Sequence, residues 1–408
     1  MNIQKKAKFT PHWFKYINVQ RKHIWVDEKI AKEGYRIFYK NRITTSKIKV
    51  AFFLDGVFYP STTGESYHIR NLLEEISKRK VESFLFRCYR GWENSEVYKK
   101  FGFNSVCIDP TIFYDNLDVV NYLLVTNKIT SVVFDTAEVV LHQGAYFKNK
   151  SSVKIIYDVT NVDHLLSKMG GLNKKTVNAQ IKDLYEADKY IDIYWVKTQN
   201  DKQQLLKLGI NPEKLKYRVV GINVPTINTP KKQHLVKTIR AVYLGNMYYP
   251  PNIGALETID KTIKECKEHG VVLSVSVIGE GDLKKLSLKY PHIKFLGECK
   301  DVIPTLRKYH LAFACPSYGS GISMKILDYM AAGLPIIANS VGVRGHSEKI
   351  RRCVLIGKND RLYECVEKIA THPAIYNKLS SEGYRYVVDN FNIKIKINKY
   401  IEDIKKLG

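Results

Sequence analysis

Residues 318–335, YGSGISMKILDYMAAGLP, combine a glycine-interrupted loop with charged side chains at a spacing that suits nucleotide chemistry. The run 322–332 after the loop is amphipathic, which predicts a helix. A glycine loop at a helix start can hold a phosphate, because free N–H groups and the helix dipole both point at it. Lys325 and Asp328 are three residues apart and therefore share one helix face. An ammonium group suits phosphate and a carboxylate suits ribose hydroxyls, so the stretch predicts a nucleotide site.

Apolar runs on both sides of this stretch predict the strands that position it. Residues 311–315 precede the loop and 336–338 follow the helix, which is the order of a βαβ unit in a parallel sheet. Similar runs alternate with helical stripes over 48–225 and again from residue 240 onward. The polar stretch 226–238 between the two series is typical of a linker. The sequence therefore predicts two α/β domains.

Polar residues that follow strand ends are candidate site residues in the first series. A loop rich in Ser and Thr follows the first predicted strand and ends at Gly64, where a backbone could approach a phosphate or sugar. The predicted strand 154–157 runs directly into Asp158, Asn161 and His164. Such sheets bind ligands at the carboxyl ends of their strands. The alternatives are an ordinary loop at Gly64 and a capping or surface role for His164.

Composition describes a globular protein of 408 residues, long enough for two domains, with 45% hydrophobic and 12% aromatic residues. Its seven scattered cysteines have no metal-ligand spacing, which favours a reducing compartment without a zinc site or disulfide framework. No apolar run approaches the roughly 18–20 residues of a membrane span, so we expect a cytoplasmic protein. The net charge of +25 favours polyanions: nucleic acid, an anionic membrane face or phosphorylated substrates. Compositional drift is the alternative explanation.

Residues 1–47 precede the first predicted core strand and form a basic, aromatic extension. They contain twelve Lys or Arg and three acids, with Trp and Tyr interleaved. This pattern suits a helix lying on an anionic membrane surface. A helix packed on the domain with a solvated basic face, or nucleic-acid binding by charge and stacking, are the alternatives.

With these motifs the chain resembles the GT-B glycosyltransferases of the retaining family 4 type (glycosyl transferases group 1). Three stretches carry the resemblance: GSGISMKILDYMAAGLPIIANSVGVRG at 319–345, LGNMYYPPNI at 244–253 and SVIGEGDLKKL at 276–286. It is strongest over about 240–345 and does not reach 1–47. The resemblance implies two facing Rossmann-like domains with a cleft between them. It places the acceptor domain at 48–232, the nucleotide-sugar domain at 233–390, and a helix at 391–408 that packs back on the first domain.

The family's signature is a pair of acids separated by seven residues across the loop and helix. Here the second position is Asp328, but the first is Ser320, which has a hydroxyl and no charge. The resemblance favours Lys325 for the phosphates, with Arg344 and Arg307 as weaker candidates. It implies roles in catalysis for His164, Lys325 and Ser320, and puts Asp158 and Asn161 on the acceptor or sugar side. It implies donor binding by Gly64, Gly245, Asn246, Gly279, Gly321, Ile322, Ser323, Lys325 and Asp328.

The implied reaction transfers a sugar from a nucleoside diphosphate sugar to a hydroxyl acceptor, with retention at the anomeric carbon. The acceptor would be a surface glycan or a lipid-linked or protein-linked intermediate. A lysine and backbone N–H groups at a helix start would stabilise the leaving diphosphate. No Asp-x-Asp motif stands at a predicted strand end, so we expect neither a metal nor another cofactor.

Other functions are compatible with the same fold. A nucleotide-sugar epimerase would need carboxylates or histidines placed for elimination, and a non-catalytic scaffold would fit the loss of the first acid to Ser320. Nothing beyond charge supports nucleic acid, so we expect no nucleic-acid partner. Attachment of 1–47 to the inner face of the membrane would make the cytoplasmic protein a peripheral membrane protein.

Overall fold

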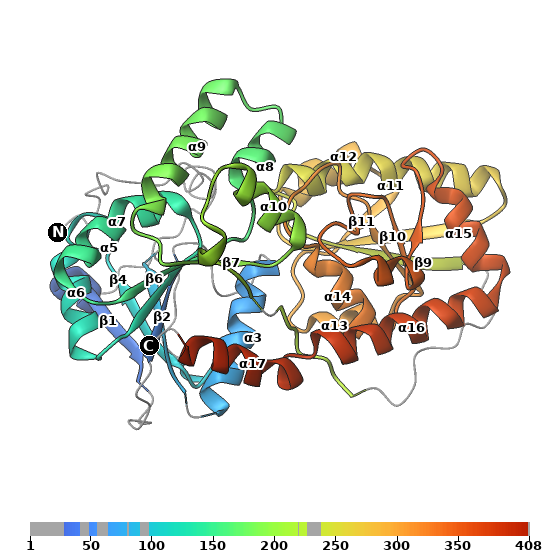
Figure 1. Ribbon diagram of the computed structural model, residues 1–408. Helices are drawn as coiled ribbons and strands as arrows, with labels where there is room; N and C mark the ends of the chain where they lie inside the picture. Colours follow the sequence, from blue (N-terminus) through green and yellow to red (C-terminus); the bar gives the residue numbers. More distant parts are fainter. Residues whose placement is uncertain are drawn as a thin grey trace.

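The computed structural model describes residues 28–40, 49–54, 64–79, 81–89, 98–218, 220–226 and 238–406. They form two α/β domains, each built around its own sheet (Figure 1). The first sheet has the strand order β1-β4-β3-β2-β5-β6-β7-β8, and the second has the order β11-β10-β9-β12-β13-β14. The predicted architecture of two α/β domains, each built on a largely or wholly parallel sheet, is confirmed.

The first domain alternates strands and helices along the chain. Its strands are β1 (Tyr35–Tyr39), β2 (Lys49–Leu54), β3 (Glu82–Cys88), β4 (Asn104–Ile108), β5 (Ser131–Phe134), β6 (Lys154–Asp158), β7 (Ile193–Val196) and β8 (Leu215–Tyr217). Its helices are α2 (Glu28–Glu33), α3 (Gly64–Lys78), α5 (Pro110–Asp115), α6 (Leu117–Thr126), α7 (Ala137–Lys150), α8 (Asp163–Met169), α9 (Lys174–Asp188) and α10 (Gln199–Lys207). Every pair of neighbouring strands is parallel except β1 and β4.

The second domain repeats this alternation in a fully parallel sheet. Its strands are β9 (Thr238–Leu244), β10 (Val272–Ile278), β11 (Ile293–Phe295), β12 (Leu311–Ala314), β13 (Ile336–Ala338) and β14 (Leu355–Ile356). Its helices are α11 (Pro250–Glu268), α12 (Leu283–Lys289), α13 (Val302–Leu306), α14 (Met324–Ala331), α15 (Leu362–Thr371) and α16 (Pro373–Phe391). None of the described helices is both long and apolar enough to cross a membrane.

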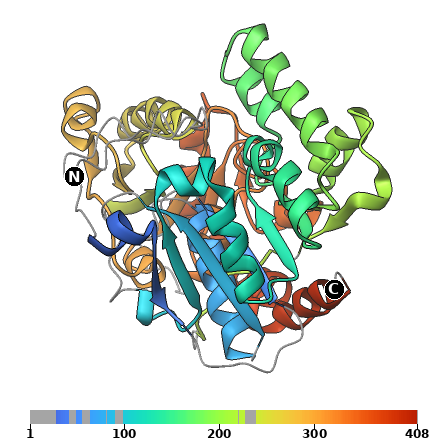
Figure 2. The same cartoon turned by 90° about the vertical axis from the view of Figure 1, so that its left-hand side faces the viewer.

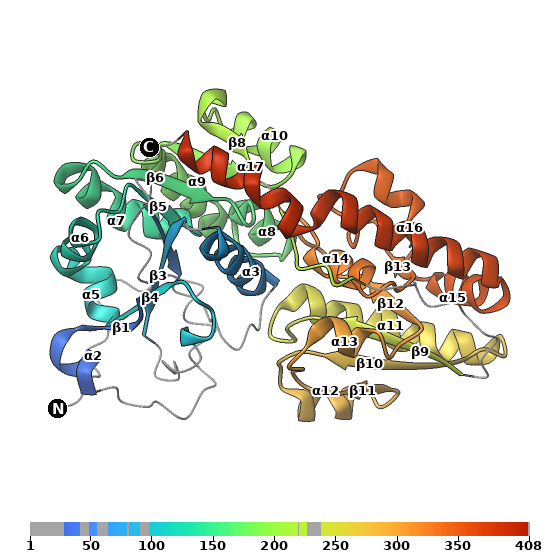
Figure 3. The same ribbon diagram turned by 90° about the horizontal axis from the view of Figure 1, so that it is seen from below.

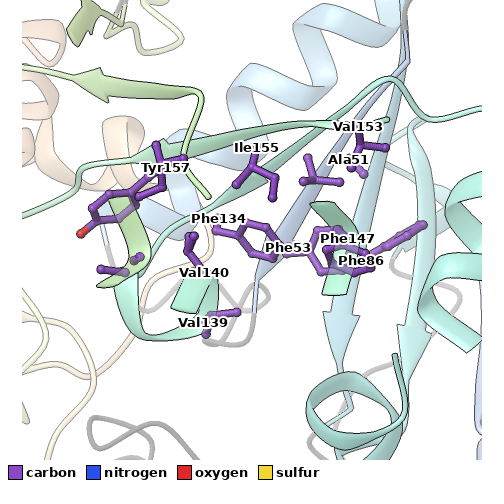
Figure 4. Packing of buried hydrophobic residues seen from close by; sticks show 14 of the residues in the cluster. Ala51, Phe53, Phe86, Phe134, Val139, Val140, Phe147, Val153, Ile155 and Tyr157 are labelled. Carbon is purple, nitrogen blue, oxygen red and sulfur yellow. The ribbon is translucent and has the colours of Figure 1, made fainter. Parts of the chain in front are cut away.

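The central strands of the first sheet are buried on both faces, which explains their continuous apolar sequences. Successive residues of a strand point to opposite faces, so Phe52 and Phe53 enter different core clusters. The ring of Phe53 lies 5.0 Å from that of Phe134 and 5.1 Å from that of Phe86, between centroids (Figure 4). These clusters hold the strand ends, and the loops that follow them, in fixed positions.

Part of the predicted extension belongs to the first domain. Residues 35–39 form β1, which pairs antiparallel with β4 at the edge of the sheet. Phe38 is buried there and its ring lies 5.3 Å from that of Tyr98, while Ile30 of α2 is also buried. Residues 28–39 of the predicted extension therefore belong to the first domain, because their apolar side chains complete one edge of its core. Residues 1–27 and 41–47 lie outside the described residues.

The chain crosses between the domains twice, at one place. Residues 220–225 lead out of the first domain, and Asn392 joins α16 to α17 (Ile393–Lys405), which packs on α3 (Figure 3). The two crossings pair: the Ile222 N–H donates to the Phe391 oxygen at 2.8 Å, and the Ile393 N–H donates to the Ile222 oxygen at 2.9 Å. A Cβ at Gly221 would lie 2.8 Å from Ile393 Cδ1, so the crossings are in close contact.

Candidate functional site

The glycine loop between β12 and α14 touches the first domain. The Ser320 hydroxyl donates to Asn161 Oδ1 at 3.1 Å, and Asn161 follows β6 of the first sheet. Gly321 has a φ of +65°, and a Cβ there would lie 2.5 Å from the Thr160 carbonyl oxygen. Only glycine therefore fits at this position, both for conformation and for space. The contacts show that the carboxyl ends of the two sheets face each other.

Lys325 lies in the first turn of α14 with its ammonium group enclosed by protein. Its Nζ donates to Asn252 Oδ1 at 2.9 Å and lies 4.0 Å from the centroid of the Tyr243 ring. Asn252 is held in turn by the Tyr243 hydroxyl and by the Asn246 carbonyl, both at 2.9 Å. Burial, followed by the nearby charge of Arg344, lowers the pKa of Lys325 to about 7. Within the described residues no carboxylate forms an ion pair with Lys325.

Arg344 supplies a second cation beside the same loop. Its Nε donates to the Ser320 carbonyl at 2.8 Å and its Nη1 donates to the Val341 carbonyl at 3.2 Å. A Cβ at Gly319 would lie 2.7 Å from the Arg344 guanidinium carbon, so the side chain lies across the loop. Burial lowers the pKa of Arg344, against the opposing effect of neighbouring tyrosines and Asp201. Two partly dehydrated cations therefore flank the loop. Arg307, the third candidate, ends α13, which packs on α14.

Asp328 is a buried carboxyl group one turn further along α14. Its Oδ1 has no hydrogen-bond partner within the part of the chain that the structure describes. Desolvation raises its pKa to about 7, because burial disfavours the charged form. Asp328 lies close enough to Tyr67 of α3 to raise the pKa of that phenol, together with burial. A buried acceptor without a donor needs an explanation, and a bound hydroxyl would provide one.

The start of α14 holds further polar groups. The Ser323 N–H donates to the Arg344 carbonyl at 3.3 Å, and the Ser323 hydroxyl is buried without a described partner. Ile322 lies beside Gly345, where a Cβ would be 2.7 Å from the Ile322 Cα. The Ser323 carbonyl accepts a hydrogen bond of 2.9 Å from His346 Nε2, and burial lowers the pKa of His346 to about 4. His346 is thus a neutral ring that supports the loop.

The predicted residues of the first domain separate into two groups. Asn161 contacts the glycine loop, and His164, at the start of α8, is buried with its pKa lowered by desolvation and then by Lys168. Asp158 lies deeper, where Arg218 Nη1 is 2.7 Å and Lys197 Nζ is 3.4 Å from its carboxylate oxygens. The carboxylate of Asp158 is therefore engaged in ion pairs inside the first domain.

The glycines at the ends of β9 and β10 bring two backbones together. Gly279 has a φ of +143°, and a Cβ there would lie 1.9 Å from the Gly245 carbonyl oxygen. Asn246 Oδ1 accepts a hydrogen bond of 2.7 Å from the Tyr248 N–H and so orders the loop that leads to α11. Gly64 begins α3, the helix that also carries Tyr67. The residues before Gly64, 55–63, lie outside the described part.

Sequence reasoning did not find Asp201, which faces the glycine loop from the first domain. Its N–H and carboxylate both bond the Thr198 hydroxyl, at 3.0 and 2.7 Å, at the start of α10. Burial raises the pKa of Asp201, while the Thr198 hydroxyl and the Gly321 amide act in the opposite direction. Gly345 has a φ of +77°, and a Cβ there would lie 2.8 Å from Thr198 Cγ2. No local motif marks these residues, because their role depends on the facing domain.

Residues 238–372 match the model of a protein family. That family is described as glycosyl transferases group 1. The match covers the whole second sheet and the glycine loop. A search of curated proteins found no match. In the part of the chain that the structure describes, no group of three or more His, Cys, Asp or Glu side chains is placed to hold a metal ion.

Solved structures share the fold over nearly their full length. Anabaena HepE in complex with UDP and glucose has a TM-score of 0.68 at 11% identity, covering 88% of this chain and 99% of HepE. Sucrose-phosphate synthase from Thermosynechococcus elongatus has a TM-score of 0.70 at 12% identity, with 88% and 99% covered. The E. coli trehalose-6-phosphate protein bound with UDP-2-fluoro glucose has a TM-score of 0.60 at 13% identity, again with 88% and 99% covered. The family match thus covers the second domain, and the solved structures show that the chain shares their two-domain fold.

Proposed function

We propose that the protein transfers a sugar from a nucleoside diphosphate sugar to a hydroxyl acceptor, with retention at the anomeric carbon as in family 4. The observation that carries the proposal is the pair of half-buried cations, Lys325 and Arg344, beside the start of α14. Two partly dehydrated cations, neither of which forms an ion pair with a described carboxylate, favour an anion of high charge density, such as a diphosphate. The structural neighbours that bind UDP or UDP-sugars support this donor class.

The proposed site stabilises the charge that develops on the leaving diphosphate. Lys325 is the primary phosphate ligand, and the Ile322 N–H joins it at the positive end of the helix dipole. The neighbouring N–H groups of Gly321 and Ser323 bond Asp201 and the Arg344 carbonyl in the donor-free protein, so they join only if the loop shifts when the donor binds. Arg344 braces the loop through the Ser320 carbonyl and adds positive potential. The bound diphosphate raises the pKa of Lys325 and keeps its ammonium charged, because an opposite charge favours the ionised form.

The proposed ribose ligand is Asp328, whose buried Oδ1 has no described donor. Two ribose hydroxyls would satisfy it and remove the cost of leaving it unpaired. The transferred sugar then lies near Ser320, Asn161 and His164, where the two domains meet. Because Ser320 carries no charge, the leaving phosphate rather than a carboxylate takes the acceptor proton on the same face. We propose that neither a metal nor another cofactor takes part.

The proposed acceptor is a surface glycan or a lipid-linked or protein-linked intermediate of polysaccharide biosynthesis, at the inner face of the membrane. A second candidate is a donor-binding protein that does not transfer sugar. The observation that favours it is Ser320 in place of the family's first acid, with its hydroxyl donated to Asn161.

A panel of nucleoside diphosphate sugars tests the proposal. One donor should raise the melting temperature and be hydrolysed slowly to the nucleoside diphosphate, because water replaces the missing acceptor. Lys325→Ala should weaken donor binding by about 100-fold, since a charge-assisted contact in a buried site is lost. The matched control is Lys285→Ala, which removes an exposed lysine of α12. A chain that responds to no donor would contradict the proposal, and binding without hydrolysis would favour the second candidate.

A further inference from the structure

Helices α8 and α9 form a hairpin that projects from the first domain (Figures 1 and 2). Its turn is fixed by two caps. Gly171 has a φ of +76°, and the Leu172 N–H returns to the Ser167 carbonyl at 2.9 Å, which ends α8 in a Schellman motif. Asn173 Oδ1 then accepts the Thr176 N–H at 2.9 Å and begins α9. The tip, residues 168–175, is therefore an ordered structure.

The tip exposes apolar side chains that the fold does not use. Met169 is 48% exposed and Leu172 is 47% exposed. In a Schellman motif the residue after the glycine commonly packs on the preceding helix. Here that residue is Leu172, which remains half in solvent although the turn around it is ordered. Fixed, exposed apolar side chains at the end of a projection suit contact with another surface.

The charged side chains of the tip have one sign. Residues 168–175 contain no Asp or Glu and three lysines, which are all exposed: Lys168, Lys174 and Lys175. None of these lysines forms an ion pair with another described residue. The partner of this surface is therefore anionic as well as apolar.

The hairpin connects this surface to the candidate site. A Cβ at Gly170 would lie 3.0 Å from the Tyr318 hydroxyl oxygen, and Tyr318 precedes the glycine loop. At the other end of α8, Asn161 lies two residues before the helix and accepts the hydrogen bond from Ser320. The length of α8, from Asp163 to Met169, is about 10 Å at the rise of an α-helix. A surface bound to the tip would therefore lie about 10 Å, the length of α8, from the candidate site.

We propose that the α8–α9 tip docks on an anionic lipid bilayer, with Met169 and Leu172 entering the interface and the lysines contacting lipid phosphates. Two apolar side chains are too few for a stable protein interface, which buries roughly 1,000 Å² or more. They suffice at a membrane, where nearby lysines add to apolar insertion. The inference rests on the proposed function in one respect: it assigns the acceptor to the lipid-linked class.

Vesicle sedimentation of the full chain tests the surface. We expect binding to phosphatidylcholine vesicles with about 30% phosphatidylglycerol, and weak binding to phosphatidylcholine alone. The variant K168Q/K174Q/K175Q should bind the anionic vesicles about 100-fold more weakly, since each lysine contributes about fivefold. The variant M169S/L172S should bind them about tenfold more weakly. The matched controls on α12, K284Q/K285Q/K289Q and Leu288→Ser, remove exposed side chains of the same kinds and should bind like the unaltered chain.

Two results would overturn the inference. One is tip variants that bind anionic vesicles within twofold of the unaltered chain, which would assign any binding to residues 1–47 or to another surface. The other is an unaltered chain that binds neutral and anionic vesicles equally or binds neither, which would favour a protein partner. The melting temperature and the hydrolysis of a soluble donor should be unchanged in every tip variant. A failure of membrane docking is therefore distinguishable from a failure of the proposed activity.

Discussion

In the first domain the buried carboxylate of Asp158 lies against Arg218 and Lys197, whereas in the second domain the half-buried Lys325 and the buried Asp328 have no ion-pair partner among the described residues. Asp158 ends β6 of the first sheet, and Lys325 and Asp328 follow β12 of the second. In the first domain the opposite charges form ion pairs with one another. In the second domain, burial lowers the pKa of Lys325, with a further contribution from the charge of Arg344, and burial raises that of Asp328, both to about 7.

This difference separates a structural use of buried charge from a functional one. A buried ion pair gives each charge a partner at all times, so it can be part of the folded core. An unpaired buried charge costs stability until a ligand supplies the missing partner. Strongly perturbed ionisable groups beside a glycine loop therefore indicate a binding site more clearly than charge does by itself.

The largest expected effect on stability comes from breaking the ion pair between Asp158 and Arg218. Arg218→Met leaves Asp158 with only Lys197, at 3.4 Å, and should lower the free energy of unfolding by about 3–5 kcal/mol. Urea unfolding followed by circular dichroism measures this loss. The double variant Asp158→Asn/Arg218→Met should recover part of it, because no uncompensated carboxylate remains. A loss below about 1 kcal/mol would show that the pair is not structural.

Removing the unpaired carboxylate of Asp328 should have the opposite effect and raise the free energy of unfolding. The pKa of Asp328 is raised above its unfolded value, so the charged form costs stability as pH rises through about 7. Asp328→Asn should therefore stabilise the donor-free protein by about 1–3 kcal/mol at pH 8, and by less at pH 5. Donor affinity should fall in the same variant. Urea unfolding at the two pH values measures the first effect.

The matched control is Asp260, whose pKa is lowered by bonds from Lys264 and His292 despite the opposing effect of burial. Asp260→Asn should destabilise the protein slightly or leave its stability unchanged. If Asp328→Asn instead destabilises the donor-free protein at pH 8, Asp328 has a partner in the native state and the contrast between the domains fails.

The smallest expected effect is the pH dependence of donor affinity. Above pH 7 free Lys325 loses its proton, so affinity should fall by up to tenfold per pH unit; below pH 7 Asp328 gains a proton, and affinity should fall again. Calorimetric titration with the donor from the panel, between pH 5.5 and about 9, measures both limbs. Lys325→Ala should lack the fall at high pH. A variant that keeps it would assign that limb to another group.

The sequence was sufficient to predict most of the parallel strands and the glycine loop, because buried strands need continuous apolar runs and the loop needs glycine. Lys325 and Asp328 could be placed on α14 from helical spacing alone. The resemblance also placed a separate helix at 391–408 on the first domain, and α17 (Ile393–Lys405) packs on α3 there. It begins at Asn392, whose side chain accepts the Lys394 N–H at 3.1 Å.

Contacts between the domains could not be predicted, because they join residues far apart in the sequence. No sequence motif pairs Ser320 with Asn161, or Gly345 with Thr198, because the members of each pair are more than 100 residues apart. The α8–α9 hairpin was also missed, since α9 is largely polar and lacks a clear apolar stripe. Edge strand β1 was assigned to the extension, because basic residues flank its apolar positions.

The two chain crossings lie side by side, joined by the bonds between Ile222 and the residues around Asn392. Two chain crossings at one place form a single hinge. Such a hinge permits rotation of one domain relative to the other but restrains translation between them. Contacts beyond the hinge, such as Ser320 with Asn161, must then break and re-form together. In the proposed reaction, each catalytic cycle would break and re-form this contact between the domains once. The frequency of the hinge rotation would then set an upper limit on the rate of product release.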